Sequence, residues 1–203
     1  MFSIEELIKG LPLSLVGSYQ SAPWRIVGEL PEILKEMVRQ LNAECVTHNN
    51  VAIHRTATIE TGAIIKGPAI IGPNCFVGAN AYLRNGVYLG NEVVIGPGCE
   101  VKTSIIMTGT HLAHFNFVGD SIVGTEVNFE AGAVICNHWN EKKGKQIKLL
   151  YQSEIIETGI EKFGAIIGDY CKVGANAVLS PGTILAKNTV VKRLELVEQI
   201  KSN

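Results

Sequence analysis

The 203-residue sequence predicts an all-β fold, a parallel β-helix in which short strands and sharp turns stack into a solenoid. Each six-residue repeat carries a large aliphatic residue and, two positions earlier, a smaller apolar one, such as Ala57 before Ile59. Side chains two apart on a strand share a face, and a turn then resets the chain direction, so a period of six fits neither an α-helix nor a continuous strand. The large aliphatic residues recur without a break: Ile53, Ile59, Ile65, Ile71, Val77, Leu83, Leu89, Ile95 and Val101.

The turns between the predicted strands are rich in glycine, proline and asparagine, as in 72–74 (GPN) and 96–98 (GPG). Glycine and asparagine tolerate positive φ, and proline presets φ for a turn, so these residues suit sharp corners. Three six-residue sides complete a triangular coil of eighteen residues. A single coil cannot bury both of its flat ends, so its stability must come from stacking on neighbouring coils.

The remaining segments are assigned by where the period fails. Residues 1–45 are expected to form a helical N-terminal extension, in which Ser3 and Glu6 have capping-box spacing and Pro31 opens a second helix. The solenoid is expected over 46–192, with a phase slip from Thr108 and a lysine-rich loop insertion at about 138–161, because insertions leave a solenoid as loops, often on its functional side. Residues 193–203 are expected to form a short C-terminal helix and tail.

Composition narrows the partners and the compartment. A net charge of -1 and an isoelectric point near 6.5 give no electrostatic footprint for nucleic acid or an anionic membrane, so neither partner is expected. The five cysteines form no CxxC pair, and Cys75 and Cys99 occupy the small inward slot of the repeat, which favours free thiols in a reducing compartment. Glu5 and Glu6 interrupt any signal-peptide pattern, and no apolar run approaches membrane-spanning length. A cytoplasmic protein is expected.

Two cations are placed to share one outer face of the solenoid. Arg84 and Lys102 each follow an inward aliphatic residue by one position and lie eighteen residues apart, and Lys66 has the same phase one coil earlier. Since stacked strands lie about 4.8 Å apart, Arg84 and Lys102 should sit one above the other. Stacked like charges favour a bound phosphate or carboxylate, whereas a solvated, salt-screened column is the plainer interpretation.

Three further polar residues are candidates for chemistry. His114 lies in the irregular segment after Thr108, where it is either a general base for an amine or an ordinary surface histidine. Asn128 and Asn137 carry amides that can bind a sugar hydroxyl or a pantetheine arm, although asparagine is equally at home in a solenoid corner.

Residues 113–120 (AHFNFVGD), 127–133 (VNFEAGA) and the pair Cys136-Asn137 resemble a known family pattern, GHLxYxGD followed by VNxGAGxxxxN. The chain is similar, over about residues 50–192, to the C-terminal domain of the bacterial bifunctional uridyltransferase/glucosamine-1-phosphate N-acetyltransferase, a hexapeptide-repeat acyltransferase. The resemblance implies a left-handed parallel β-helix, a homotrimer, and acetyl-CoA lying between neighbouring prisms.

The resemblance also implies roles for residues that would bind the sugar. His114 matches the family's catalytic base. Arg84 and Lys102 match, at unchanged spacing from that histidine, the two cations that hold the sugar phosphate. Asn128 matches a sugar-contacting asparagine, and Phe117 replaces a sugar-contacting tyrosine, keeping the ring without its hydroxyl.

A second set of residues is implied at the acetyl-CoA site. Asn137 matches an asparagine of that site. Lys162 matches a lysine that precedes a similar IIGD run when the extra loop is treated as an insertion, whereas alignment without a gap puts Lys143 there. Backbone N–H groups near Ala131 or Ala175 are candidates for steadying the oxyanion and complete the predicted cofactor site.

The sequence also departs from that family. The 203 residues hold no counterpart of the glycine-rich nucleotide loop of the uridyltransferase domain, the loop 138–161 is longer, and the prism after Ala165 is at least one side shorter. Solenoids of the γ-carbonic anhydrase type resemble this pattern too and bind zinc, typically with two histidines five apart. His111 and His114 are three apart, so with His138 nearby no metal is expected.

These observations predict an acetyl-CoA-dependent N-acetyltransferase acting on an amino-sugar phosphate such as glucosamine-1-phosphate. The alternative is a non-catalytic hexapeptide-repeat subunit that binds or regulates a separate sugar nucleotidyltransferase, because fold alone does not establish turnover. His114, Arg84 and Lys102 favour the enzyme, while Phe117 and the shortened C-terminal prism favour the binding subunit.

Overall fold

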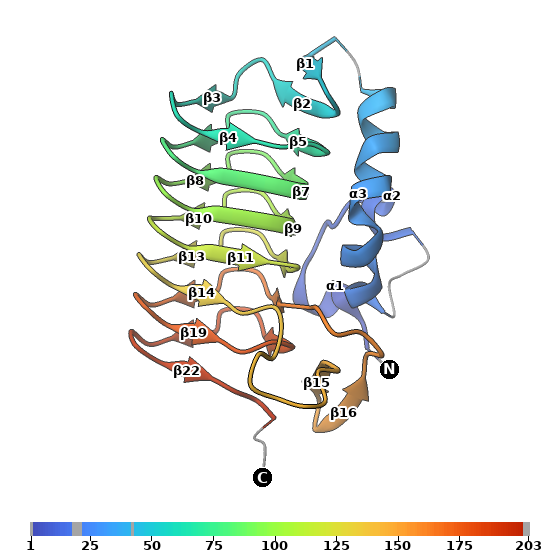
Figure 1. Ribbon diagram of the computed structural model, residues 1–203, viewed down its shortest axis with the longest axis vertical. Helices are drawn as coiled ribbons and strands as arrows, with labels where there is room; N and C mark the ends of the chain where they lie inside the picture. Colours follow the sequence, from blue (N-terminus) through green and yellow to red (C-terminus); the bar gives the residue numbers. More distant parts are fainter. Residues whose placement is uncertain (1, 18–21, 42, 201–203) are drawn as a thin grey trace.

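A computed structural model describes residues 2–17, 22–41 and 43–200 and shows a tall, three-sided β-solenoid with helices along one side (Figure 1). Successive coils run from the N-terminal end of the solenoid to its C-terminal end, and strands on each side pair in parallel with the coil above and below. The predicted all-β solenoid with an N-terminal helical extension is therefore confirmed.

The strands define three walls, numbered here so that each coil runs from wall 1 to wall 2 to wall 3; the first coil begins on wall 2. Wall 1 and wall 2 belong to one continuous sheet, because β7 and β9 run through the corner between them, and wall 3 is a separate sheet. Wall 1 contains β4 (Ile64–Ile65), the first halves of β7 (Tyr82–Leu89) and β9 (Glu100–Ile106), β11 (Phe117–Gly119), β14 (Val134–Ile135), β19 (Val178–Leu179) and β22 (Leu196–Val197). Wall 2 contains β2 (Val51–His54), β5 (Ala69–Ile71), the second halves of β7 and β9, β12 (Ile122–Val123), β17 (Ala165–Ile167) and β20 (Thr183–Leu185). Wall 3 contains β3 (Thr58–Ile59), β6 (Phe76–Val77), β8 (Val94–Ile95), β10 (His111–Leu112), β13 (Asn128–Phe129), β18 (Lys172–Val173) and β21 (Val190–Val191).

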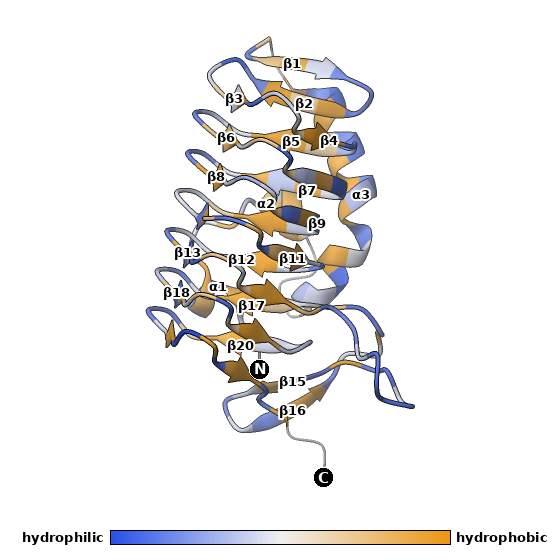
Figure 2. Ribbon diagram, turned by 60° about the vertical axis from the view of Figure 1, so that its left-hand side comes forward, coloured by the Kyte–Doolittle hydropathy of each residue, from blue (hydrophilic) through white to orange (hydrophobic). Residues whose placement is uncertain are grey.

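The six-residue pattern fills the interior as predicted. The inward aliphatic residues from Ile71 to Val101 are fully buried, whereas Ile53, Ile59 and Ile65 of the first coil are only partly covered. In Figure 2 the strands are mainly hydrophobic and the corners mainly hydrophilic. The free thiols of Cys75, Cys99 and Cys171 lie buried in the small slots, and burial raises the pKa of the Cys75 thiol to about 11.

The phase slip predicted from Thr108 lies earlier in the chain, between Lys102 and Ser104. Val101 is in register with Val118, seventeen residues away rather than eighteen, and Ile106 rather than Met107 lies inside the solenoid. One residue is missing at the corner between wall 1 and wall 2. The Ser104 hydroxyl bridges this corner, because it donates to the Lys102 carbonyl at 2.7 Å and accepts the Ser121 N–H at 3.1 Å.

The N-terminal extension covers the outer face of wall 2. It comprises α1 (Ile4–Leu7), α2 (Leu13–Val16) and α3 (Pro23–Gln40), whose apolar faces join outward residues of wall 2 in a second core. Pro31 lies inside α3, so the prediction that it opens a helix is wrong. The helix begins at Pro23, where the missing N–H costs nothing at a first-turn position.

The inserted segment and the C-terminus also differ from expectation. The predicted loop contains an antiparallel hairpin, β15 (Lys148–Tyr151) and β16 (Glu154–Glu157), which adds buried residues to the second core. At the N-terminal end of the solenoid, β1 (Cys45–His48) folds back antiparallel on β2. The predicted C-terminal helix is wrong over residues 193–200, because β22 pairs with β19 and continues wall 1 for another coil; residues 201–203 lie outside the described part. No described helix is long and apolar enough to cross a bilayer.

Candidate active site

The two predicted phosphate-binding cations are stacked on wall 1. Arg84 of β7 lies opposite Lys102 of β9 in the parallel ladder, as their eighteen-residue spacing predicts. Lys66 follows β4 one coil above, and its ammonium lies 5.2 Å from the centre of the Tyr82 ring, while the Arg84 guanidinium lies 5.7 Å from the same ring. The sequence therefore brings three cations to one column beside the corner with wall 2.

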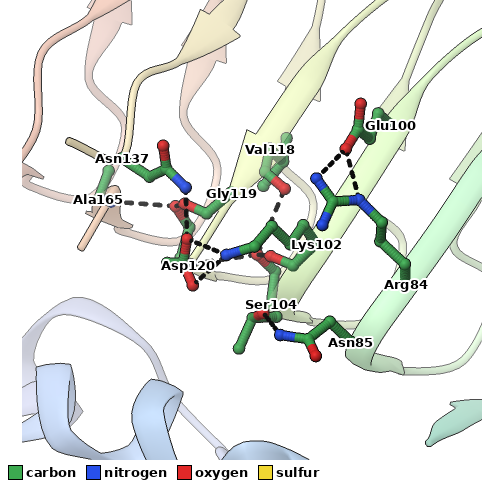
Figure 3. A network of polar contacts seen from close by, with 12 residues as sticks. Arg84, Asn85, Glu100, Lys102, Ser104, Val118, Gly119, Asp120, Asn137 and Ala165 are labelled. Carbon is green, nitrogen blue, oxygen red and sulfur yellow. Dashed lines mark hydrogen bonds and ion pairs between the residues drawn. The ribbon is translucent and has the colours of Figure 1, made fainter. Parts of the chain in front are cut away.

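Each of the two lower cations has a carboxylate partner from the next coil that sequence reasoning missed (Figure 3). Arg84 donates through Nε and Nη2 to Glu100 Oε1 at 2.8 and 2.7 Å. Lys102 Nζ donates to Asp120 Oδ1 and Oδ2 at 2.8 and 2.7 Å, and these two side chains are only 15% and 9% exposed. The column thus presents paired charges rather than bare cations.

Asp120 extends this network to the predicted acetyl-CoA residue. The Asn137 amide, which follows β14, donates to Asp120 Oδ2, the same oxygen that accepts one of the Lys102 hydrogen bonds (Figure 3). The Phe117 ring lies beside the same group, because a Cβ added to Gly119 would lie 2.7 Å from the Phe117 ring and 2.9 Å from Asn137 Nδ2. Gly119 therefore leaves the space in which the ring and the amide meet.

Buried serines hold the backbone beneath the network. The Ser121 hydroxyl donates to the Gly119 carbonyl at 2.7 Å and accepts the Ala165 N–H at 3.0 Å, repeating the role of Ser104 one coil above. Gly164 passes so close that an added Cβ would lie 2.2 Å from Ser121 Oγ and from the Gly119 carbonyl oxygen. These contacts fix the corner from which Lys102 and Asp120 project.

His114 lies at the corner between wall 3 and wall 1, after β10 and before β11. Its side chain is exposed, and its carbonyl accepts the Gly132 N–H at 2.9 Å. Among the described residues, no hydrogen bond or ion pair joins its imidazole to Arg84, Lys102 or Asp120. The predicted base is thus accessible at the edge of the cation wall but separate from its polar network.

The other predicted residues lie on or near wall 3. Asn128 is exposed on β13, in register between His111 and Lys172. The Ala175 N–H donates to Glu130 Oε2 at 2.8 Å, so in this structure it is already occupied. Arg193 also donates to Glu130 through Nε and Nη2, and Arg193 and the Ala175 N–H together lower the pKa of that carboxyl to about 2, with the arginine as the larger cause.

The remaining candidates are the backbone of Ala131 and the two alternative lysines, Lys162 and Lys143. Ala131 lies exposed in the turn after Glu130, and its carbonyl accepts the Asn176 N–H at 3.0 Å. Lys162 lines a groove whose other residues include Asp120 and, from the first turns of α3, Arg25 and Gly28. Lys143 is exposed in the inserted loop. Of the two lysines, Lys162 is therefore the one that shares a groove with Asp120.

The histidines predicted not to bind a metal lie in different elements. His111 is on β10, His114 is in the following corner, and His138 is exposed after β14. The residues that the structure describes contain no group of three or more histidine, cysteine or carboxylate side chains placed to hold an ion.

Comparison with known proteins places two segments of the solenoid. Residues 68–103 match the family described as bacterial transferase hexapeptide (six repeats), and residues 159–192 match the hexapeptide repeat of succinyl-transferase. Over 88 residues the chain is 39% identical to a bifunctional sugar-1-phosphate nucleotidylyltransferase/acetyltransferase of Sulfurisphaera tokodaii, covering 43% of this chain and 21% of that protein. Over 110 residues it is 34% identical to the bifunctional protein GlmU of Methanocaldococcus jannaschii, covering 54% and 26%. The chain thus spans about a quarter of the length of such curated relatives.

Solved structures give a weaker likeness. A hexapeptide transferase family protein from Anaplasma phagocytophilum superposes with a TM-score of 0.42 at 18% identity, covering 71% of this chain and 70% of that one. A GDP-perosamine N-acetyl transferase from Caulobacter crescentus, solved with CoA and GDP-perosamine, superposes with a TM-score of 0.31 at 13% identity, covering 75% and 56%. From the sequence matches, two segments of the chain are similar to hexapeptide repeats of bacterial transferases, and its curated homologues include bifunctional sugar-1-phosphate nucleotidyltransferase/acetyltransferases.

Proposed function

We propose that this protein is an acetyl-CoA-dependent N-acetyltransferase that acts on an amino-sugar phosphate such as glucosamine-1-phosphate. The observation that carries the proposal is the stacking of Arg84 on Lys102 beside Asn137 and Phe117. The similarity to bifunctional sugar-1-phosphate nucleotidyltransferase/acetyltransferases supports the same chemistry.

The phosphate of the acceptor would bind to N–H groups of two cations that are already paired with carboxylates. Arg84 has N–H groups beyond the two that reach Glu100, and Lys102 has a third proton beyond the two that reach Asp120. Lys66, exposed one coil above, leaves the column with one net positive charge. Such directional donors select a phosphate by geometry as well as by charge.

His114 would act as the general base. The substrate amine attacks the thioester carbonyl, and the new N–C bond forms as His114 accepts the amine proton. The C–S bond then breaks, and the departing thiolate takes that proton to leave as the CoA thiol. A positioned base contributes about 10²–10⁴-fold to such a step. The exposed position of His114 between the two walls leaves its imidazole open to an acceptor held at Arg84 and Lys102.

The way the site residues divide between two walls supports a shared acyl-donor site. Asn137 and Lys162 lie near Asp120 on the wall 1 side, whereas Asn128, Ala131 and Ala175 lie on or beside wall 3. In a homotrimer, wall 3 of one prism would face wall 1 of the next and complete a site for acetyl-CoA between them. A separate nucleotidyltransferase would be a fitting partner for this protein, because it could use the acetylated sugar phosphate. Five free cysteines suit the reducing cytoplasm as the place of this chemistry.

A thiol-release assay tests this function directly. Acetyl-CoA is presented with a panel of amino sugars and their phosphates, and release is expected only with an amine, and more strongly with its phosphate. Release that needs no amine would mean hydrolysis. Binding of sugar phosphate without release from any panel member would favour the non-catalytic binding subunit.

A further inference from the structure

Asp120 is the point at which two separate parts of the candidate site meet. Its carboxylate accepts two hydrogen bonds from Lys102 Nζ, at 2.8 and 2.7 Å, and one from the Asn137 amide. The first of these partners belongs to the predicted phosphate site and the second to the predicted acetyl-CoA site. No other described side chain has hydrogen bonds to both of them.

The backbone of Asp120 is held as firmly as its side chain. The residue has φ +49° at the corner after β11, a conformation that aspartate tolerates better than most residues. Its N–H donates to the Lys102 carbonyl at 2.9 Å, and its carbonyl accepts the Gly164 N–H at 2.9 Å. With only 9% of the side chain exposed, the carboxylate has little freedom to leave its partners.

We propose that Asp120 is a positioning residue that sets the Lys102 ammonium and the Asn137 amide relative to each other, and so couples acceptor binding to acyl-donor binding. The inference rests on the proposed function. Lys102 donates two hydrogen bonds to Asp120, which leaves its third N–H free to donate to a phosphate. A phosphate that draws on the ammonium weakens its hold on the carboxylate, which then binds the Asn137 amide more strongly and steadies it for acetyl-CoA.

The variant Asp120→Asn keeps the shape and removes the charge. It leaves the Lys102 ammonium without its carboxylate and places a second amide against that of Asn137. The kcat/KM for glucosamine-1-phosphate should therefore fall about 10–100-fold, and the KM for acetyl-CoA should rise. The matched control is Asp169→Asn, because Asp169 is also buried, at 3% side-chain exposure, and accepts the Thr125 N–H at 3.0 Å with Lys187 nearby. Asp169→Asn should lower the melting temperature and leave both KM values unchanged.

A double variant separates positioning from a general structural effect. If Asp120 acts through Lys102, the variant Asp120→Asn with Lys102→Met should lose no more acceptor kcat/KM than Lys102→Met alone. Additive losses, or a change in Asp120→Asn confined to melting temperature, would overturn the positioning role.

The wild-type protein supplies a test that does not depend on any variant folding. In calorimetric titrations, CoA should bind at least about fivefold more tightly when glucosamine-1-phosphate is saturating. Titration with glucosamine-1-phosphate in the presence of saturating CoA should show the same factor. Equal affinities with and without the sugar phosphate contradict the coupling. A wild-type protein that turns over while the affinities are uncoupled overturns this inference alone, whereas a wild-type protein with no turnover overturns the proposed function and this inference together.

Discussion

Arg84 lies opposite Lys102 across one coil of the solenoid, yet each cation pairs with a carboxylate from the coil below, Glu100 or Asp120. The two pairs differ in burial. Glu100 is 34% exposed, so water can solvate it if Arg84 is removed, whereas Asp120 would be left nearly buried without a counter-charge. The same wall therefore has one tolerant and one sensitive position.

The first prediction compares Lys102→Ala with Arg84→Ala. Both should raise the KM for the sugar phosphate, and Lys102→Ala should raise it more, because the unpaired Asp120 carboxylate then repels the phosphate. Lys102→Ala should also cost about 2–4 kcal/mol in the free energy of unfolding. Urea unfolding and steady-state kinetics on both variants check this. Equal effects on stability would show that burial does not distinguish the pairs.

The second prediction concerns the base. His114→Ala should lower kcat about 10²–10⁴-fold while the affinity for sugar phosphate stays within about twofold, since the imidazole takes a proton but, among the described residues, has no hydrogen bond or ion pair to Arg84 or Lys102. Stopped-assay rates and calorimetric affinities give the two quantities separately. A variant that retains wild-type turnover would remove His114 from the mechanism.

The third prediction restores a hydroxyl. The Phe117 ring lies beside Gly119 and Asn137, so Phe117→Tyr would place a new donor next to the candidate site. One added hydrogen bond should lower the KM for the amino sugar about two- to tenfold, with the KM for acetyl-CoA unchanged. An unchanged sugar KM would place the ring outside the sugar site.

Much of this site follows from the repeat alone, and the exceptions have physical reasons. Arg84 and Lys102 could be paired from sequence because inward packing keeps each coil in register. An eighteen-residue step from Lys102 would put Asp120 opposite it, but the ladder steps by seventeen there and places Gly119 opposite Lys102, so Asp120 reaches the ammonium from the corner one residue further on. Glu100 has the same outward parity as Lys102, two residues before it. The sequence indicated a phase slip but not the corner where it lies, because the Ser104 hydroxyl closes that corner with one residue fewer and leaves no separate signal in the repeat.

The flanking segments were harder to predict because no repeat constrains them. Gly28 and Pro31 are poor helix formers inside α3, and they hide its start at Pro23. Leu196 and Val197 fit a helical spacing, but their pairing with Val178 and Leu179 gives them a place in the next coil. Stacking on a preformed coil outweighs the local helical preference of so short a segment.

The fourth prediction tests the close packing beneath the network. Gly164→Ala would press a Cβ against Ser121 Oγ and the Gly119 carbonyl oxygen, so it should cost about 3 kcal/mol or more in the free energy of unfolding. Gly28→Ala is the control, because in the described structure nothing beyond its chain neighbours and the nearby backbone of α3 lies within 4 Å of its added Cβ, and alanine is the better helix former, by about 0.5–1 kcal/mol. Denaturant unfolding should show opposite signs for the two variants, and a neutral Gly164→Ala would contradict the tight corner.

The fifth prediction concerns acid stability. The pKa of Glu130 falls from 4.5 to about 2 in the folded state, chiefly through Arg193 and then through the Ala175 N–H. A lowered carboxyl pKa stabilises the fold above the unfolded value and loses that contribution as the pH falls from about 4.5 to 2. Unfolding of the wild type and of Glu130→Gln is to be compared from pH 7 to pH 2. The stability difference should shrink across this window, and a difference independent of pH would show that the ionised carboxyl is not what stabilises the turn.

The central claim is that the stacked cations hold a sugar phosphate whose amine receives an acetyl group. Mass spectrometry of the products from acetyl-CoA and glucosamine-1-phosphate, with wild type, His114→Ala and Lys102→Ala in parallel, tests it most directly. We predict one added acetyl group on the sugar nitrogen with the wild type, and little or none with either variant. An acetylated product that forms equally well with all three proteins, or no acetylated amino sugar with any of them, would contradict the account.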